Sequence, residues 1–264
     1  MKRIIYHFII VALFLSNIMS GNAQQYFKVN NVSGSCVIAN ISPEKAKENA
    51  LFNAKIEALR QAGIPENLLA EITQMGEIFI ETSNIEIGGG ITEYEIVSDE
   101  IRIAQEGKSR ILISEVVINA KVVKYNKESD PSFQIKVQAL KSVYKEQETL
   151  YFDVTAYQNG YLRIFLFEED GTGTQIYPDK AIEPDMLFMK NNTIKFPIND
   201  HYYYVVEKTD KTKNKEINRI LFLFLKDNIN FTEDYINLQS ILNWKAGISP
   251  DKRTQVFREF TIEQ

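Results

Sequence analysis

The chain has one cysteine, two histidines and one tryptophan among its 264 residues, and these scarcities limit its chemistry. Because Cys36 has no companion, no intrachain disulfide can form. One histidine, His7, lies in the apolar amino-terminal region, which leaves His201 as the single candidate in the rest of the chain. Metal clusters need several ligands at set spacings, and His201 lacks them. We therefore expect no metal site and no cofactor.

The motifs of nucleophilic and nucleotide chemistry are also missing. No Gly-x-Ser-x-Gly elbow occurs. Gly107, Lys108 and Ser109 resemble the end of a phosphate-binding loop, but Arg102 stands where that loop needs another glycine, and a strand is expected to follow instead of a helix. These absences predict a protein that is not an enzyme.

Acidic residues are plentiful enough to keep one catalytic alternative open. The stretch around Gly171 fails as an EF-hand loop, although Glu168, Asp170 and Asp179 could form an irregular cation site. Glu183 and Asp185 could form a hydrolytic pair, because two carboxylates at a suitable separation cleave glycosidic bonds. A hydrolase or metal-dependent enzyme that uses the acidic loops near 168–185 is therefore an alternative.

An excess of basic residues is absent as well. The formal charge is −5, and it becomes −7 when Lys2 and Arg3 are removed with the first 23 residues. Nucleic-acid affinity comes largely from Lys and Arg on phosphates, so we expect no nucleic-acid partner. The lysine cluster at 208–215 is interpreted as a solvated loop.

The first 23 residues have the layout of a secretory signal peptide. A basic start precedes an apolar run at 8–15, and Gly21 and Ala23 place small residues where a signal peptidase reads, which predicts cleavage between Ala23 and Gln24. The run falls short of the ~20 residues that span a bilayer. We expect an exported protein in the periplasm, the extracellular space or the cell surface, without a transmembrane segment after cleavage. Cys36 lies too far from the run to carry a lipid anchor.

The segment 24–126 is expected to form an α+β module. Residues 24–31 form a polar lead-in, a short strand follows at 32–38, and Ser42 and Pro43 begin a helix that ends before Gly63. Alanines recur at every fourth position, which puts them on one face that can lie flat against a small antiparallel sheet: Ala46, Ala50, Ala54, Ala58 and Ala62. A second helix is predicted at 66–75, and strands at 91–103 and 111–125.

The segment 127–264 is expected to form a mostly β, sandwich-like domain. Polar residues at 125–131 mark the boundary, and patterned strands follow at 133–140, 149–157, 161–167, 193–198, 202–207, 217–225 and 256–262. The run from Ile220 to Leu225 is apolar on both faces, which predicts a central strand covered by a helix at 232–246. The predicted fold class is α+β.

Tyrosine supplies the candidate binding surface. On the predicted strand at 202–207, Tyr202 and Tyr204 share a face, and exposed tyrosines suit sugars or peptides because they combine apolar area with a hydroxyl. The alternative is that these rings line the β-core with their hydroxyls at its rim. A glycan-binding module is therefore a second alternative function.

Two regions resemble known families. The segment 30–125 has a glycine-containing strand, the alanine-striped helix and a strand that ends at Val122, and it is similar to the amino-terminal domain of flagellar assembly protein T and related envelope modules. The run from Tyr151 to Pro178, with Asp170 and Gly171 at a turn and a later strand at 221–225, resembles domain of unknown function family 4384, and we expect the resemblance to extend over residues 131–264. These resemblances imply an exported bacterial cell-envelope protein that binds or scaffolds another envelope protein or a cell-wall component. Neither implies a reaction.

Overall fold

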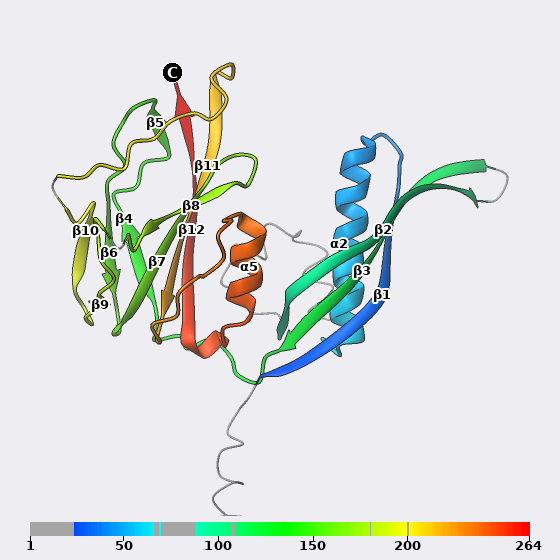
Figure 1. Cartoon of the computed structure of the whole chain (residues 1–264), viewed down its shortest axis with the longest axis horizontal. Helices are drawn as coiled ribbons and strands as arrows, with labels where there is room; N and C mark the ends of the chain where they lie inside the picture. The colour runs from blue at the N-terminus through cyan, green and yellow to red at the C-terminus, as the bar shows by residue number, and fades with distance from the viewer. Residues whose placement is uncertain (1–23, 66–68, 70–87, 107–108, 180, 200) are drawn as a thin grey trace, which may run out of the picture.

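The computed structural model describes residues 24–65, 69, 88–106, 109–179, 181–199 and 201–264. The predicted signal peptide and most of the predicted helix at 66–75 lie outside these residues. The predicted α+β fold class is confirmed: among the described residues, two α-helices accompany several mainly antiparallel sheets, and the carboxy-terminal part is mostly β (Figure 1). Within the described residues, no helix combines the length and apolar character needed to cross a membrane.

The amino-terminal part is a three-stranded sheet with one helix on it. Strand β1 (Gln25–Val37) and strand β2 (Gly89–Glu106) flank the central strand β3 (Ser109–Lys124), and both pairings are antiparallel. The expected polar lead-in at 24–31 is wrong, because Gln25 to Val29 already pair with β3 before a bulge interrupts the ladder. Glu106 pairs with Ser109, so a strand follows Gly107 and Lys108 as predicted.

Helix α2 (Pro43–Gln61) begins and packs as its sequence predicts. The Ser42 hydroxyl accepts a hydrogen bond from the Lys45 amide, which satisfies a donor of the first turn. The five alanines of the stripe are buried against β1 and β3. At Gly34 the helix comes so close to β1 that an added Cβ would lie 2.1 Å from the Ala54 nitrogen. This contact requires glycine in the strand and alanine in the helix.

The carboxy-terminal part contains two sheets. The smaller sheet has the order β10 (Thr193–Phe196), β6 (Phe152–Ala156), β4 (Ile135–Gln138). The larger has the order β5 (Val143–Lys145), β12 (Arg253–Glu263), β11 (Lys215–Leu225), β7 (Gly160–Phe167), β8 (Gly173–Tyr177), with β9 (Leu187–Phe188) also paired to β7. The pairing of β12 with β5 is parallel, and the others are antiparallel.

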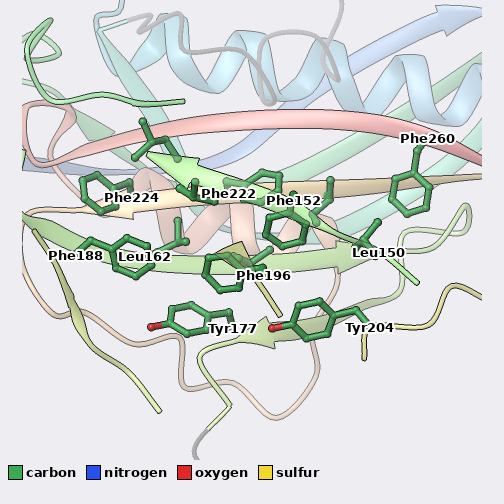
Figure 2. Packing of buried hydrophobic residues seen from close by; sticks show 14 of the residues in the cluster. Leu150, Phe152, Leu162, Tyr177, Phe188, Phe196, Tyr204, Phe222, Phe224 and Phe260 are labelled. Carbon is green, nitrogen blue, oxygen red and sulfur yellow. The ribbon is translucent and has the colours of Figure 1, made fainter. Parts of the chain in front are cut away.

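An aromatic core fills the space between these two sheets. Phe152 of the smaller sheet meets Phe222 of the larger sheet edge-on, with 5.1 Å between ring centroids. Figure 2 shows the rings of Phe196, Tyr177 and Tyr204 in the same cluster. Edge-to-face and offset stacked rings at such distances contribute beyond their buried area. The core therefore joins strands that are distant in sequence.

Strand β11 is buried on both faces, as the run from Ile220 to Leu225 predicts. Ile220, Phe222 and Phe224 belong to the core between the sheets. On the other face, helix α5 (Leu238–Ala246) covers the strand, and Ile241 packs in the cluster that contains Leu221. A 3₁₀ turn (Pro250–Lys252) then leads into β12.

Helix α5 is shorter than predicted, because the residues before it pair with a turn of the larger sheet. The Gly173 amide donates to the Ile236 carbonyl, and the Leu238 amide donates to the Gly171 carbonyl. Asn237 then caps the helix through the Ser240 amide. These bonds keep 232–236 out of the helix.

Helix α5 also connects the two parts of the molecule, and it lies between them in Figure 1. It contacts β2, the Tyr125 hydroxyl donates to the Ala246 carbonyl over 3.1 Å, and Lys55 Nζ donates to Gln239 Oε1 over 2.9 Å. Each part has its own apolar cluster. The division into domains 24–126 and 127–264 remains a prediction.

The close approach at Gly34 yields a stability prediction. We expect Gly34→Ala to lower the free energy of unfolding by about 1–3 kcal/mol, because the new methyl group would collide with backbone atoms of α2. Urea denaturation measures this change. Ser35→Ala is the matched control, because Ser35 is exposed on the same strand and its loss should stay within about 0.5 kcal/mol. Equal stability of the two variants would contradict the proposed contact.

Candidate functional site

The two tyrosines of the predicted binding surface have different environments. Tyr202 is 37% exposed, whereas Tyr204 is only 7% exposed and belongs to the aromatic core. The Tyr202 ring packs edge-on against Tyr204, with 5.6 Å between centroids. The expectation that both rings form an exposed platform is therefore wrong for Tyr204. The alternative interpretation, a core ring with its hydroxyl at the rim, describes Tyr204.

The predicted strand at 202–207 is replaced by a single bridge. Thr149 and Val205 form an isolated antiparallel bridge, and the Leu150 amide donates to the Tyr204 carbonyl over 2.8 Å. Side chains still alternate along this extended segment, so Tyr204 and Val206 point into the core while Tyr203 and Val205 are exposed. Tyr203 and, to a smaller extent, Tyr202 reach solvent, whereas Tyr204 does not.

A buried carboxylate fixes the position of Tyr204. Glu183 is 2% exposed, and it accepts hydrogen bonds from the Tyr204 hydroxyl and from the amides of Ile198 and Asn199. Burial, together with this bond to Glu183, raises the pKa of the Tyr204 phenol well above its usual value. The carboxylate thereby joins three loop segments beneath the exposed tyrosine.

Exposed aromatic side chains gather next to this anchor. Tyr151 and Tyr203 each lie two residues from the bridged pair of Thr149 and Val205, on its solvent side, and they are 52% and 54% exposed. The bridge and the bond between Leu150 and Tyr204 therefore bring together the two segments that carry these exposed tyrosines. Neither was identified from the sequence as a binding residue, because a propensity for strand does not say which of three consecutive tyrosines faces out.

Polar side chains continue from these tyrosines across the outer face of the smaller sheet. One row across the strands consists of Lys195, Asp153 and Gln138, and the next contains Thr193, Thr155 and Lys136. The hydroxyls of Thr155 and Thr193 lie 2.7 Å apart. The row of β6 side chains ends with Tyr157, which is 41% exposed.

We call this surface the tyrosine face and define it by Tyr151, Asp153, Thr155, Tyr157, Lys195 and Tyr203. Tyr151 and Tyr157 are six residues apart in nearly extended chain, a separation of roughly 20 Å. Between these rings lie a carboxylate, hydroxyls and an ammonium group. The face therefore presents apolar rings and hydrogen-bonding groups together on one side of a sheet.

The acidic residues of the enzyme alternative are held in other bonds. Asp185 forms a bidentate pair with the fully buried Arg163, with 3.0 Å between each of its oxygens and a guanidinium nitrogen. Asp170 accepts from the Thr172 amide, and Asp179 accepts from the amides of Ala181 and Ile182. These bonds favour structural roles for the acids, including the pair of Glu183 and Asp185.

The remaining candidates are dispersed. His201 is exposed on a turn, and Cys36 is half-buried on β1 in the amino-terminal part. Within the described residues, no group of three or more His, Cys, Asp or Glu side chains is placed to hold a metal ion. A shallow cavity of about 540 Å³ opens beside β5, and its lining residues from 141–148 and 263–264 include none of these candidates.

One lysine of the predicted solvated loop is buried. Lys208 is 2% exposed, and its Nζ donates to the Lys213 carbonyl over 2.7 Å, with a Glu146 carboxylate oxygen at 3.8 Å. Lys211, Lys213 and Lys215 remain exposed, as predicted. The loop closes around Lys208 because a buried ammonium group needs acceptors.

The anchor predicts a stability difference between neighbouring tyrosines. We expect Tyr204→Phe to lower the free energy of unfolding by about 1.5–3 kcal/mol, because the buried Glu183 carboxylate loses a donor. Tyr203→Phe is the matched control and should stay within about 0.5 kcal/mol. Denaturant unfolding of both variants measures the difference, and equal losses would contradict the anchor.

The same bond gives a pH dependence. The folded protein holds the Tyr204 proton more tightly than the unfolded chain, in which the phenol has a pKa of about 10. The stabilisation that this proton provides is therefore fully present at neutral pH and is lost progressively as the pH rises above about 10. Tyr204→Phe should make this alkaline decrease shallower. An unchanged slope would show that Tyr204 does not contribute to it.

Comparison with known proteins finds a similar family for part of the carboxy-terminal region. No curated protein matches the chain, and nothing in the comparisons supports the resemblance of the amino-terminal part to flagellar assembly protein T. A family described as Domain of unknown function (DUF4384) matches residues 143–213. This range contains Tyr151, Tyr203 and the buried Glu183, and it confirms the carboxy-terminal resemblance: residues 143–213 are similar to the DUF4384 family.

Proposed function

We propose that this protein is a non-catalytic component of the bacterial cell envelope that binds a cell-wall glycan through its tyrosine face. The observation that carries the proposal is the exposure of Tyr151 and Tyr203 on two bridged segments, together with the polar rows of the smaller sheet. Sugars offer apolar C–H faces to aromatic rings and hydroxyls to hydrogen-bonding groups, so both chemistries of the face are used. A scaffold function follows if the rest of the chain contacts other envelope components.

The surrounding structure holds the backbone of the two exposed tyrosines in place. Tyr204 is stacked on Phe152 with 6.3 Å between centroids and is bonded to Glu183, so the backbone that carries Tyr203 is fixed. Tyr151 directly precedes the buried Phe152 of β6. Rigid attachment lowers the entropy that a ligand must remove on binding.

Export is the second element of the proposal. It rests on the basic start, the apolar run and the small residues at 21 and 23, all of which precede the described residues. A carboxy-terminal region that is similar to a domain of unknown function is compatible with any compartment, so a separate experiment must test this element.

Glycan binding predicts loss of affinity on ring removal. Tyr151→Ala and Tyr203→Ala should each weaken co-sedimentation of the purified protein with purified peptidoglycan by at least about tenfold, as expected when a binding tyrosine is truncated. Tyr235→Ala is the matched control, because Tyr235 is 63% exposed and lies outside the tyrosine face.

The same incubation separates binding from hydrolysis. Release of soluble sugar from the peptidoglycan, abolished by Glu183→Gln, would replace the proposal by the hydrolase alternative. Unchanged binding of both alanine variants would show that the tyrosine face is not the glycan site.

Export predicts a processed amino terminus. In the envelope fraction of expressing cells, intact mass spectrometry should find a protein that begins at Gln24. Ala23→Asp should leave the precursor uncleaved, because the peptidase reads a small residue at this position. Asn22→Asp introduces the same charge at a position that is not read and should be cleaved normally. An unprocessed wild-type chain would contradict the export proposal.

A further inference from the structure

One row of side chains on the amino-terminal sheet is left without a cover. Helix α2 packs mainly on β1 and β3, while β2 lies at the edge of the sheet beside β3. The register places Ile96, Asp99, Ile101 and Ile103 on the helix side, opposite Ile118, Val116, Ser114 and Leu112, and Asp99 is bonded to Lys47 of α2. Ile101, Ile103 and Leu112 are 55%, 67% and 47% exposed. Figure 1 shows the β2–β3 hairpin extending past the end of α2.

The backbone of β2 has one edge that no described strand covers. Among the described strands, β2 pairs with β3 alone, so the edge at Ile101 and Ile103 that points away from β3 faces none of them. An apolar edge strand of this kind is a template for a further strand. Native edges are often blocked by a bulge and by charges, and β2 has a bulge between Ile96 and Ser98. Beyond this bulge the ladder is regular from Asp99 to Glu106.

Two charges on this regular segment, Glu100 and Arg102, are complementary across a two-fold axis. Glu100 and Arg102 lie on the face opposite the isoleucines, one residue before and one residue after Ile101. In an antiparallel pair of two β2 strands with Ile101 at the two-fold axis, Glu100 of each strand lies opposite Arg102 of the other. Opposite charges directly across a ladder stabilise the pairing, and like charges destabilise it.

The existing contacts of these two residues are compatible with such pairing. Arg102 Nε lies 2.5 Å from a carboxylate oxygen of Glu115 on β3, which orients the guanidinium group across the outer face. Within the described part of the chain, Glu100 has no ion-pair partner. A second copy would place its Arg102 opposite Glu100. Because a two-fold interface is self-complementary, the same ion pair would form a second time with the two copies exchanged.

We propose that two copies of this protein associate through antiparallel pairing of their β2 edges, with Ile101 at the two-fold axis. The product is a continuous sheet made of two three-stranded halves, in which both α2 helices lie on the same side. Ile101 then meets its counterpart on the helix side of this sheet, and Ile103 of each copy lies opposite Asp99 of the other. This inference concerns the amino-terminal part and does not depend on glycan binding.

Charge reversal tests both the association and its register. The purified wild-type protein should sediment as a dimer in analytical ultracentrifugation and dissociate on dilution. Glu100→Arg and Arg102→Glu should each weaken self-association at least about tenfold, because each places like charges across the ladder. An equimolar mixture of the two variants should restore the dimer, since positions 100 and 102 are both basic in one copy and both acidic in the other. Glu233→Arg, the same change at an exposed position outside β2, should leave the dimer intact.

A disulfide test determines directly which residue lies at the two-fold axis. Residues opposite one another in an antiparallel ladder have Cα atoms about 4.5–5.5 Å apart, within the range of a disulfide. In a Cys36→Ser background, Ile101→Cys should therefore give a covalent dimer on oxidation. Ile103→Cys should not, because the two copies of residue 103 would be about 13 Å apart.

The oligomeric state of the wild-type protein, the variants and their mixture decides whether the proposed dimer exists. A monomeric wild-type protein, dimerisation that survives both charge reversals, or a mixture that stays monomeric would overturn the proposal. Circular dichroism of each variant shows whether it is folded. The sedimentation of the wild-type protein and of the equimolar mixture tests the proposal without relying on the loss of association in one variant. Unchanged peptidoglycan binding by Glu100→Arg would show that this interface and the tyrosine face act separately.

Discussion

The burial of β11 on both faces is the constraint on which the carboxy-terminal part depends. Alternate side chains of this strand enter two different apolar clusters, one between the sheets and one beneath α5. A strand that is apolar on both faces is stable only when both are covered. The smaller sheet therefore has to lie on one side and α5 on the other. Because α5 also contacts β2, the same requirement joins the two parts of the molecule.

The buried polar groups depend on this layering. Arg163 lies on β7 next to β11 and is fully buried, and its charge is compensated by Asp185, Asn228 and the Ile229 carbonyl. Glu183, two residues before Asp185, is also buried and is bonded to three donors. Buried charges are tolerated only with such partners, and the loss of one partner is costly. These bonds explain why the irregular segments at 179–204 have defined positions, and hence why the tyrosines above them face outward.

The two exposed surfaces of the protein differ in chemistry. The tyrosine face combines aromatic rings with hydroxyls and charges of both signs, which suits a polar ligand with apolar patches. The edge of β2 away from β3 carries exposed isoleucines, which suits another strand. They belong to different sheets, so each can be occupied without the other. Such a separation is what a scaffold requires, because one component is bound while another copy is recruited.

The sequence by itself determined the elements whose local signals are strong. Ser42 and Pro43 fixed the start of α2, the alanine repeat fixed its buried face, and the unbroken run at 220–225 fixed a central strand. These signals are short-range, so they survive whatever the rest of the chain does. Tertiary structure decided the remainder. Tyr204 turned inward because Glu183 lies beneath it, Lys208 was buried because its loop supplied acceptors, and 232–236 left the helix because it paired with the turn after β7. Each of these outcomes depends on a partner many residues away or on the closure of a loop, and a single sequence does not specify which distant groups will meet.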